Sequence, residues 1–179
     1  IAAALGNVDP DDSWEQHFID TMKSGKFLNN WRKVEIYAKE APAGVIELEQ
    51  WGALFNRTPE GKISQRPFGG HTYRRLAHVG DRTGLEMIRT LQEKLLATDA
   101  RVYMETTVTK LFKDERGRIS GALAYTRESG RFVFFKVKAI IMATGGWGRI
   151  YKVTSNSWEG TGDGVILAYD AGAELVDME

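Results

Sequence analysis

The stretch AIIMATGGWGRIY, residues 139–151, decides the fold class. Its first five residues, Ala139 to Ala143, are all apolar, a pattern typical of a strand buried on both faces of a parallel sheet. Gly145, Gly146 and Gly148 follow, and without a Cβ they let the backbone approach a ligand closely. In open α/β sheets, ligands bind beyond the carboxyl ends of strands. The stretch therefore predicts a ligand site at these glycines. A tight turn that only redirects the chain is the alternative.

The complete dinucleotide fingerprint GxGxxG is missing, because Tyr151 and Leu167 stand where the third glycine would follow the two G-x-G pairs. This absence disfavours a nicotinamide-dependent Rossmann enzyme. A phosphate-binding loop would have to lie upstream of Ile1. The chain has no initiator methionine, and ELVDME at residues 174–179 looks like a strand that stops in mid-element. We therefore expect the chain to be part of a longer protein.

A second segment, EGTGDGVILAYDAG at residues 159–172, predicts a helix over 164–171 that ends at Gly172. Asp163 stands between two glycines at the start of this helix. A carboxylate there can cap free backbone amides or accept a hydrogen bond from a ligand hydroxyl. The two roles are compatible, and an N-cap is the simpler one.

A third segment, QRPFGGHTYRRLAHVGDRTG at residues 65–84, contains four arginines, two histidines and a GG step. Arginine binds carboxylates in bidentate fashion, so such a loop suits a dianionic substrate. A solvated basic loop is the equally simple alternative. His71 and His78 are not at the i, i+4 spacing of a helical metal pair, so we interpret both as structural.

The first 55 residues predict three short helices. The first follows Ser13, with Gln16 completing a capping-box pattern, and ends at Gly25; the second begins near Asn30; the third begins after Pro42 and ends at Gly52. Four residues share one face of the first helix and are expected in the core: Trp14, Phe18, Ile19 and Met22.

The second half changes character. A helix is predicted from Asp81, with an apolar face of Leu85, Ile88, Leu91 and Leu95. Three strand-like runs follow at 102–111, 119–126 and 131–137, separated by the turns ERGR and ESGR, and they predict an antiparallel meander. The organisation expected is an α/β fold with a helical subregion at 1–55, an active-site-facing loop at 56–80, and the helix, β-meander and nucleotide-binding strand at 81–179.

Composition narrows the function. The chain has 24 lysines and arginines and 24 aspartates and glutamates. It therefore lacks the excess of basic charge that would indicate a nucleic-acid partner. The chain has no cysteine, which excludes a disulfide, a cysteine-ligated iron–sulfur or zinc site and a cysteine nucleophile. Its three histidines are too few and too badly spaced to predict a metal site. No apolar run approaches the ~18 residues that a membrane-spanning helix needs.

These segments, in this order, resemble the flavoprotein subunit of succinate dehydrogenase and fumarate reductase. The matching stretches are QRPFGG, the strand with ATGGWGRIY, TSN to TGDG, the terminal VDME, and ALGN at residues 4–7, which resembles the segment after the family's flavin-linking histidine. The resemblance implies the middle of a Rossmann-like FAD-binding domain. The covalent flavin site would precede Ile1. The substrate histidine and the capping domain, with its proton-shuttling arginine, would follow Glu179.

The resemblance also implies the binding residues. It places Phe68, Gly69 and Gly70 beside a dicarboxylate substrate and the flavin ring, and no catalytic residue within this chain. The residues that it places at FAD are Val108, Ala143, Thr144, Gly145, Gly146, Thr154, Asn156 and Asp163. The residue patterns alone indicate only 143–146 and Asp163. Val108 and Phe68 rest on the resemblance.

The implied chemistry is the interconversion of succinate and fumarate, with hydride passing between a substrate carbon and the flavin. Electrons would continue to an iron–sulfur partner subunit, which fits the lack of cysteine here. Membrane-anchor subunits would hold the complex at the cytoplasmic face of the inner membrane or the mitochondrial matrix face. The chain alone is expected to be inactive.

Two alternatives stay open. L-aspartate oxidase has a similar flavin domain but typically carries an acidic residue directly before the GG, where this chain has Phe68, which offers no charge to an ammonium group. The other is a flavin-domain fragment without catalytic activity.

Overall fold

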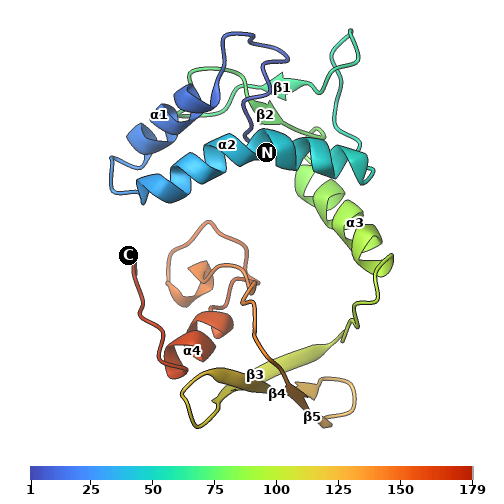
Figure 1. Ribbon diagram of the computed structural model, residues 1–179, viewed down its shortest axis with the longest axis vertical. Helices are drawn as coiled ribbons and strands as arrows, with labels where there is room; N and C mark the ends of the chain where they lie inside the picture. Colours follow the sequence, from blue (N-terminus) through green and yellow to red (C-terminus); the bar gives the residue numbers. More distant parts are fainter. Residues whose placement is uncertain (179) are drawn as a thin grey trace. The chain divides into compact units, whose positions relative to one another are not determined.

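The structure is a computed structural model that describes residues 1–178, and these divide into two compact units, residues 1–100 and the described residues from 101 on (Figure 1). In the first unit, α1 (Trp14–Ser24) begins at Ser13, whose Oγ accepts a hydrogen bond from the Gln16 backbone N–H at 3.2 Å. It ends at Gly25. This confirms the prediction for the first helix.

The predicted break at Pro42 is wrong, because α2 (Trp31–Gln50) runs through it. Proline lacks the N–H that would bond to the Ala38 carbonyl, a defect that costs about 3 kcal/mol in a helix interior. Ala38 and Val45, on either side of Pro42, are buried, and their packing offsets this cost. The helix ends where predicted, since Gly52 follows with φ +102°, a conformation that favours glycine.

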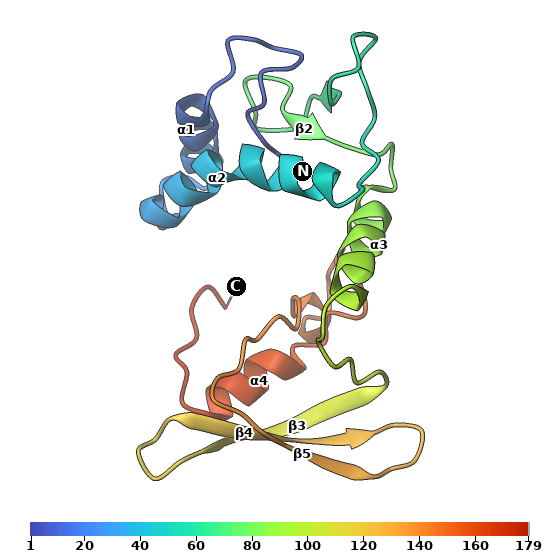
Figure 2. The same cartoon turned by 45° about the vertical axis from the view of Figure 1, so that its right-hand side comes forward.

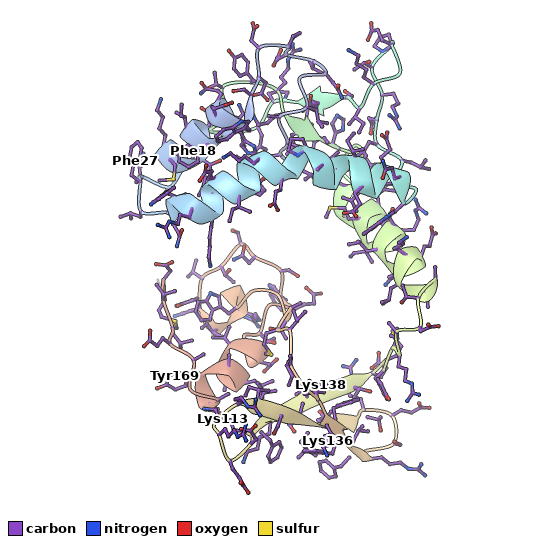
Figure 3. The ribbon with its side chains drawn as sticks, in the orientation of Figure 1. Phe18, Phe27, Lys113, Lys136, Lys138 and Tyr169 are labelled. Atoms are coloured by element: carbon purple, nitrogen blue, oxygen red, sulfur yellow. The ribbon has the colours of Figure 1, made fainter. Side chains whose placement is uncertain are left out.

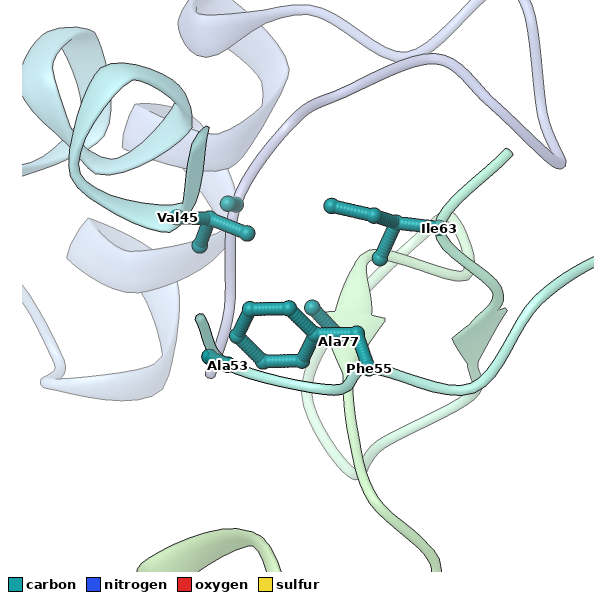
Figure 4. Close-up of a cluster of buried hydrophobic side chains, with 6 residues drawn as sticks. Val45, Ala53, Phe55, Ile63 and Ala77 are labelled. Atoms are coloured by element: carbon teal, nitrogen blue, oxygen red, sulfur yellow. The ribbon is translucent and has the colours of Figure 1, made fainter. Parts of the chain in front are cut away.

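The segment predicted as a loop at 56–80 contains a short antiparallel pair, β1 (Gln65–Arg66) and β2 (Leu76–Ala77). Ala77, in β2, and Ile63, just before β1, enter a buried hydrophobic cluster with residues from the N-terminal segment, α2 and the stretch after it (Figure 4). The members of the cluster are Ala3, Val45, Ala53, Phe55, Ile63 and Ala77. The ends of the segment are therefore anchored, and Phe68 to Gly70 lie in the stretch between the strands.

The buried face of α1 differs from the prediction. Met22 is buried, as predicted, but Ile19 is 40% exposed and Phe18 is only partly covered (Figure 3). The other buried residues of α1 are His17 and Asp20. The buried face of α1 carries polar residues because the Asp20 carboxylate accepts hydrogen bonds from the Thr72 backbone N–H and hydroxyl there. The apolar face of α3 (Thr83–Leu96) is likewise exposed at all four predicted positions, and Thr90 is the buried residue of this helix.

The second unit confirms the predicted meander. Strands β3 (Thr106–Lys113), β4 (Ile119–Thr126) and β5 (Phe132–Lys136) pair antiparallel in the order β3-β4-β5, with Thr107 opposite Tyr125 and Ala124 opposite Val133 (Figure 2). Helix α4 (Asp163–Asp170) contacts β3 and begins one residue earlier in the sequence than predicted.

The predicted buried strand at 139–143 is not formed. These residues have no regular structure, and Ile141 is 92% exposed. A strand exists only if a neighbour supplies its hydrogen bonds. Among the described residues of this unit the only sheet is the meander, which residues 139–143 do not join. After them comes a single 3₁₀ turn, η1 (Gly148–Ile150).

Candidate functional site

The glycine-rich segment after residue 143 lines a hollow of about 490 Å³ in the second unit. We call it the glycine hollow, and its lining residues are Thr144, Gly145, Gly146, Gly148, Asn156, Ser157, Glu159 and Gly160. Four predicted cofactor-binding residues therefore come together here: Thr144, Gly145, Gly146 and Asn156. Ala143 lines a neighbouring hollow that shares Thr144 and Gly145.

At Gly148 and Gly160 the chain packs too closely to leave room for a side chain. A Cβ added to Gly148 would lie 2.7 Å from Asn156 Nδ2 and 2.9 Å from Thr154 Oγ1. A Cβ on Gly160 would lie 3.2 Å from the Gly146 carbonyl oxygen. Thr154 Oγ1 in turn accepts a hydrogen bond from the Asn156 backbone N–H at 3.1 Å. Close backbone packing thus brings Thr154 and Asn156, which the resemblance places at FAD, against the glycine segment.

Gly145 and Gly146 differ, because a Cβ on either would have no atom of the described residues within 4 Å. Gly145 has φ +73°, which alone favours glycine there. Gly146 has neither a positive φ nor a neighbour to avoid. The absence of a side chain at Gly146 therefore leaves free a space that no other part of the chain occupies. A ligand that lies against the backbone would fit this space.

Asp163 is not the N-cap of α4, contrary to the prediction. Gly162 caps the helix with φ +79°, and Asp163 is its first residue, exposed, accepting a hydrogen bond from Thr161 Oγ1. The left-handed backbone at the cap position favours glycine. The carboxylate is not used by the helix amides. Gly164 contacts Thr144, which places the start of α4 beside the glycine hollow.

Val108 and the Phe68 segment are not among the residues that line the glycine hollow. Val108 is half-buried on β3. Phe68 belongs to the first unit and is 62% exposed. Gly70, with φ +81°, packs on α1, since an added Cβ would lie 2.6 Å from Ser24 Oγ. Gly69 is exposed beside it.

The basic segment at 65–84 is less cationic than its composition indicates. Arg74 pairs with Asp9 at the surface. Arg75 is fully buried and bridges Asp12 at 2.7 Å and Asp20 at 3.0 Å. The predicted dianion-binding role therefore does not extend to these two arginines, because their charges are already paired.

Sequence reasoning missed the buried polar cluster around Arg75. Burial opposes ionisation of Asp20, but hydrogen bonds from Thr72 and Gln16 and the charge of Arg75 bring its pKa below the usual range. His17 lies one turn before Asp20 on the same buried face of α1. The i, i+3 spacing of His17 and Asp20 was the available signal, because it places both side chains on one helix face.

The chain matches the family model of the FAD binding domain over residues 1–179. It is 45% identical over 99% of its length to a fumarate reductase (CoM/CoB) subunit of Methanothermobacter marburgensis, covering 32% of that protein. It is 42% identical over 100% of its length to the succinate dehydrogenase flavoprotein subunit of Coxiella burnetii, again covering 32%.

Among solved structures, a chain of the Mycobacterium smegmatis Sdh1 complex in the apo form superposes with a TM-score of 0.91 at 57% identity. The match covers 96% of this chain and 31% of that one. No helix among residues 1–178 combines the length and the apolar character needed to cross a membrane. The chain, which spans about a third of the length of these relatives, belongs to the FAD binding domain family and within it to the flavoprotein subunits of succinate dehydrogenases and fumarate reductases, which are oxidoreductases.

Proposed function

We propose that this chain forms part of the FAD site of a flavoprotein that interconverts succinate and fumarate. The observation that carries the proposal is the glycine hollow of about 490 Å³, which brings Thr144, Gly145, Gly146 and Asn156 together and which the backbone at Gly146 lines without a side chain. A ligand that lies against the backbone explains it. When bound, FAD supplies the hydride chemistry that amino-acid side chains cannot perform.

In this proposal the adenosine half of FAD lies along Ala143 to Gly146. Thr154 and Asn156, which pack against Gly148 of the same segment, also contact it. The exposed Asp163 carboxylate, which the helix amides do not use, accepts a hydrogen bond from a ribose hydroxyl. Val108 adds an apolar contact from β3. The covalent attachment site is outside these residues.

The exposed apolar stretch 139–143 supports a Rossmann-like completion of the domain. Five apolar residues that lack a sheet neighbour here are suited to a parallel sheet built with other parts of the flavoprotein. The relatives are about three times as long as this chain and have room for those parts and for a capping domain.

Phe68, with Gly69 and Gly70, forms the substrate-facing segment in this proposal. Its ring is exposed on a stretch anchored at both ends by β1 and β2, and it presents a rigid apolar surface without charge. That surface suits the hydrocarbon centre of a dicarboxylate better than an amino acid, whose ammonium needs an acidic partner. This favours succinate or fumarate over aspartate.

The partners that we propose are membrane-anchor subunits and an iron–sulfur subunit, with the flavoprotein held at the membrane surface through them. The similar chain in the Mycobacterium smegmatis Sdh1 complex supports this. Residues 1–179 contain no cysteine, so they supply no thiolate ligand to an iron–sulfur cluster.

The test replaces Gly146 with valine and measures FAD content and FAD affinity of the purified flavoprotein. The matched control is Gly84→Val, because an added Cβ at Gly84 also meets no atom of the described residues within 4 Å and its φ is not positive. We expect Gly146→Val to weaken FAD binding at least about tenfold, the equivalent of about 1.4 kcal/mol, with an unchanged melting temperature. Equal FAD affinity in both variants would refute the assignment.

A further inference from the structure

Residues 68–71 of the first unit form a tight turn. The His71 backbone N–H donates a hydrogen bond to the Phe68 carbonyl oxygen at 3.3 Å, and Gly70 between them has φ +81°. A β-turn with left-handed backbone at its third residue favours glycine there. Gly70 also packs on α1, since an added Cβ would lie 2.6 Å from Ser24 Oγ. The turn therefore lies against α1, and Phe68, its first residue, is exposed.

The sheet does not reach this turn. Strands β1 and β2 pair only where Gln65 faces Ala77 and Arg66 faces Leu76, so residues 67–75 lie outside the ladder. Fixing each residue of such a stretch in one conformation costs conformational entropy. Contacts from outside the ladder must therefore hold the turn in place.

Asp20 of α1 makes the closest of these contacts. Its Oδ2 accepts a hydrogen bond from the Thr72 backbone N–H at 2.8 Å, and its Oδ1 accepts one from the Thr72 hydroxyl at 2.7 Å. Gln16 Nε2 donates to Oδ1 at 2.8 Å, and Arg75 Nη1 lies 3.0 Å from Oδ2. Each oxygen of this buried carboxylate thus has two donors, which fills its acceptor sites. Because Thr72 follows the turn directly, Asp20 fixes both the backbone and the side chain at the end of the turn.

Arg75 connects the turn to the same carboxylate by a second route. Its Nη1, which contacts Asp20, also lies 3.3 Å from His71 Nδ1. A guanidinium can only donate, so His71 Nδ1 is the acceptor. His71 is the last residue of the turn. Asp20 therefore acts on the turn directly at Thr72 and indirectly, through Arg75, at His71.

Asp12 shows that Arg75 has a counter-charge without these contacts. The Asp12 side chain is 1% exposed and accepts hydrogen bonds from Arg75 Nε at 3.1 Å and from Nη2 at 2.7 Å, a bidentate pair. Within the part of the chain that the structure describes, the Asp12 carboxylate accepts no hydrogen bond from residues 68–74. What Asp20 adds to the cluster is the contact with Thr72.

We propose that Asp20 is a positioning residue, which holds the turn at 68–71 against α1 and so fixes where the Phe68 ring meets the substrate. That Phe68 faces the substrate rests on the proposed function. Asp20 does not touch the substrate and acts through Thr72 and Arg75. Hydrogen bonds to an ionised group are roughly twice as strong as neutral ones, which suits an anchor for a stretch that the ladder does not reach.

The experiment compares Asp20→Ala with Asp12→Ala in the flavoprotein that contains this chain. Both variants remove a buried carboxylate that binds Arg75, but only Asp20→Ala removes the acceptor of the Thr72 amide. The first readout is hydrogen exchange at the backbone amides of His71 and Thr72. We expect exchange at least about tenfold faster in Asp20→Ala than in Asp12→Ala, because these amides lose the contacts that hold the turn closed.

The second readout is the steady-state kinetics with succinate. Relative to Asp12→Ala, Asp20→Ala should raise KM at least about tenfold and change kcat less, because a displaced Phe68 weakens substrate binding. Asp20→Asn keeps an acceptor oxygen for the Thr72 amide and should restore most of both readouts. If Asp20→Ala does not fold, Thr72→Val decides. It removes only the hydroxyl contact and should raise KM about threefold over Thr72→Ser, which keeps that contact.

Equal exchange at residues 71 and 72 in the two alanine variants would overturn the proposal. Faster exchange in Asp20→Ala with the same KM as in Asp12→Ala would overturn it too, because the anchor would then have no consequence for the substrate. The proposed function fails separately. It is refuted if succinate does not reduce the flavin of the unaltered protein, whatever the exchange rates are, whereas succinate turnover together with equal exchange refutes only the role of Asp20.

Discussion

Replacing Arg75 with methionine should lower the free energy of unfolding by about 3–5 kcal/mol at neutral pH, the range for removing one partner of a buried ion pair. The side chains of Arg75, Asp12 and Asp20 are 0%, 1% and 5% exposed, so solvent screens this cluster little. Methionine is similar in length but carries no charge, and it leaves two buried carboxylates without a cation. Domains are stable by about 5–15 kcal/mol, so the loss is a large share of the total.

The pH dependence of this loss has a definite sign. In the unaltered protein the pKa of Asp20 is lowered, so the stability that this group contributes is present above about pH 4 and is lost as the pH falls through the lower folded value. Without Arg75, Asp20 loses one of the contributions that lower its pKa, so its ionisation stabilises the fold less than in the unaltered protein. The difference between the two proteins should therefore be largest at neutral pH and should shrink towards about pH 4.

The assay is urea denaturation followed by tryptophan fluorescence at several pH values. Arg74→Met is the matched control, because Arg74 is the neighbouring residue and pairs with Asp9 at the surface. It should change stability little, since exposed ion pairs contribute little. The reasoning fails if the two variants are equally stable, or if the deficit of Arg75→Met is independent of pH.

Two further predictions concern the candidate sites. Phe68→Glu should raise the ratio of aspartate to succinate turnover at least about tenfold, because a carboxylate can pair with an ammonium group; an unchanged ratio of kcat/KM values would contradict the selectivity argument. Gly164→Ala should destabilise the fold by about 1–3 kcal/mol, because the added Cβ would lie 2.5 Å from Thr144 Cβ, which side-chain rotation cannot relieve. Gly44→Ala, in open space on α2, is the control, and thermal melts compare the two.

The features that the sequence predicts well are those set by neighbouring residues. The Ser13 cap and the Gly25 stop of α1 need only a few adjacent side chains and backbone amides. The meander follows from alternating strands joined by turns at Gly117 and Gly130, both with positive φ. In each case the decisive interactions join residues that are close in the sequence or that belong to consecutive strands.

The features that the sequence predicts badly depend on distant partners. Pro42 stays helical because Ala38 and Val45 pack against other segments, which local propensity does not include. The inward face of α1 is polar because Arg75, more than fifty residues away in the sequence, supplies a counter-charge for Asp20. The apolar run at 139–143 specifies a strand only in the presence of a neighbouring strand. Hydrophobic pattern alone contains none of this information.

In the candidate FAD site, too, some features follow from neighbouring residues and others depend on distant parts of the chain. The sequence predicts that glycines cluster after residue 143, but it treats them as equivalent. The structure separates Gly148 and Gly160, whose missing Cβ atoms allow chain-to-chain packing, from Gly146, whose missing Cβ faces open space. Packing glycines hold Thr154 and Asn156 in place, and Gly146 leaves the backbone accessible. A substitution at Gly148 should therefore cost folding stability first. One at Gly146 should cost ligand affinity first, because the space that this glycine leaves free lies outside the chain.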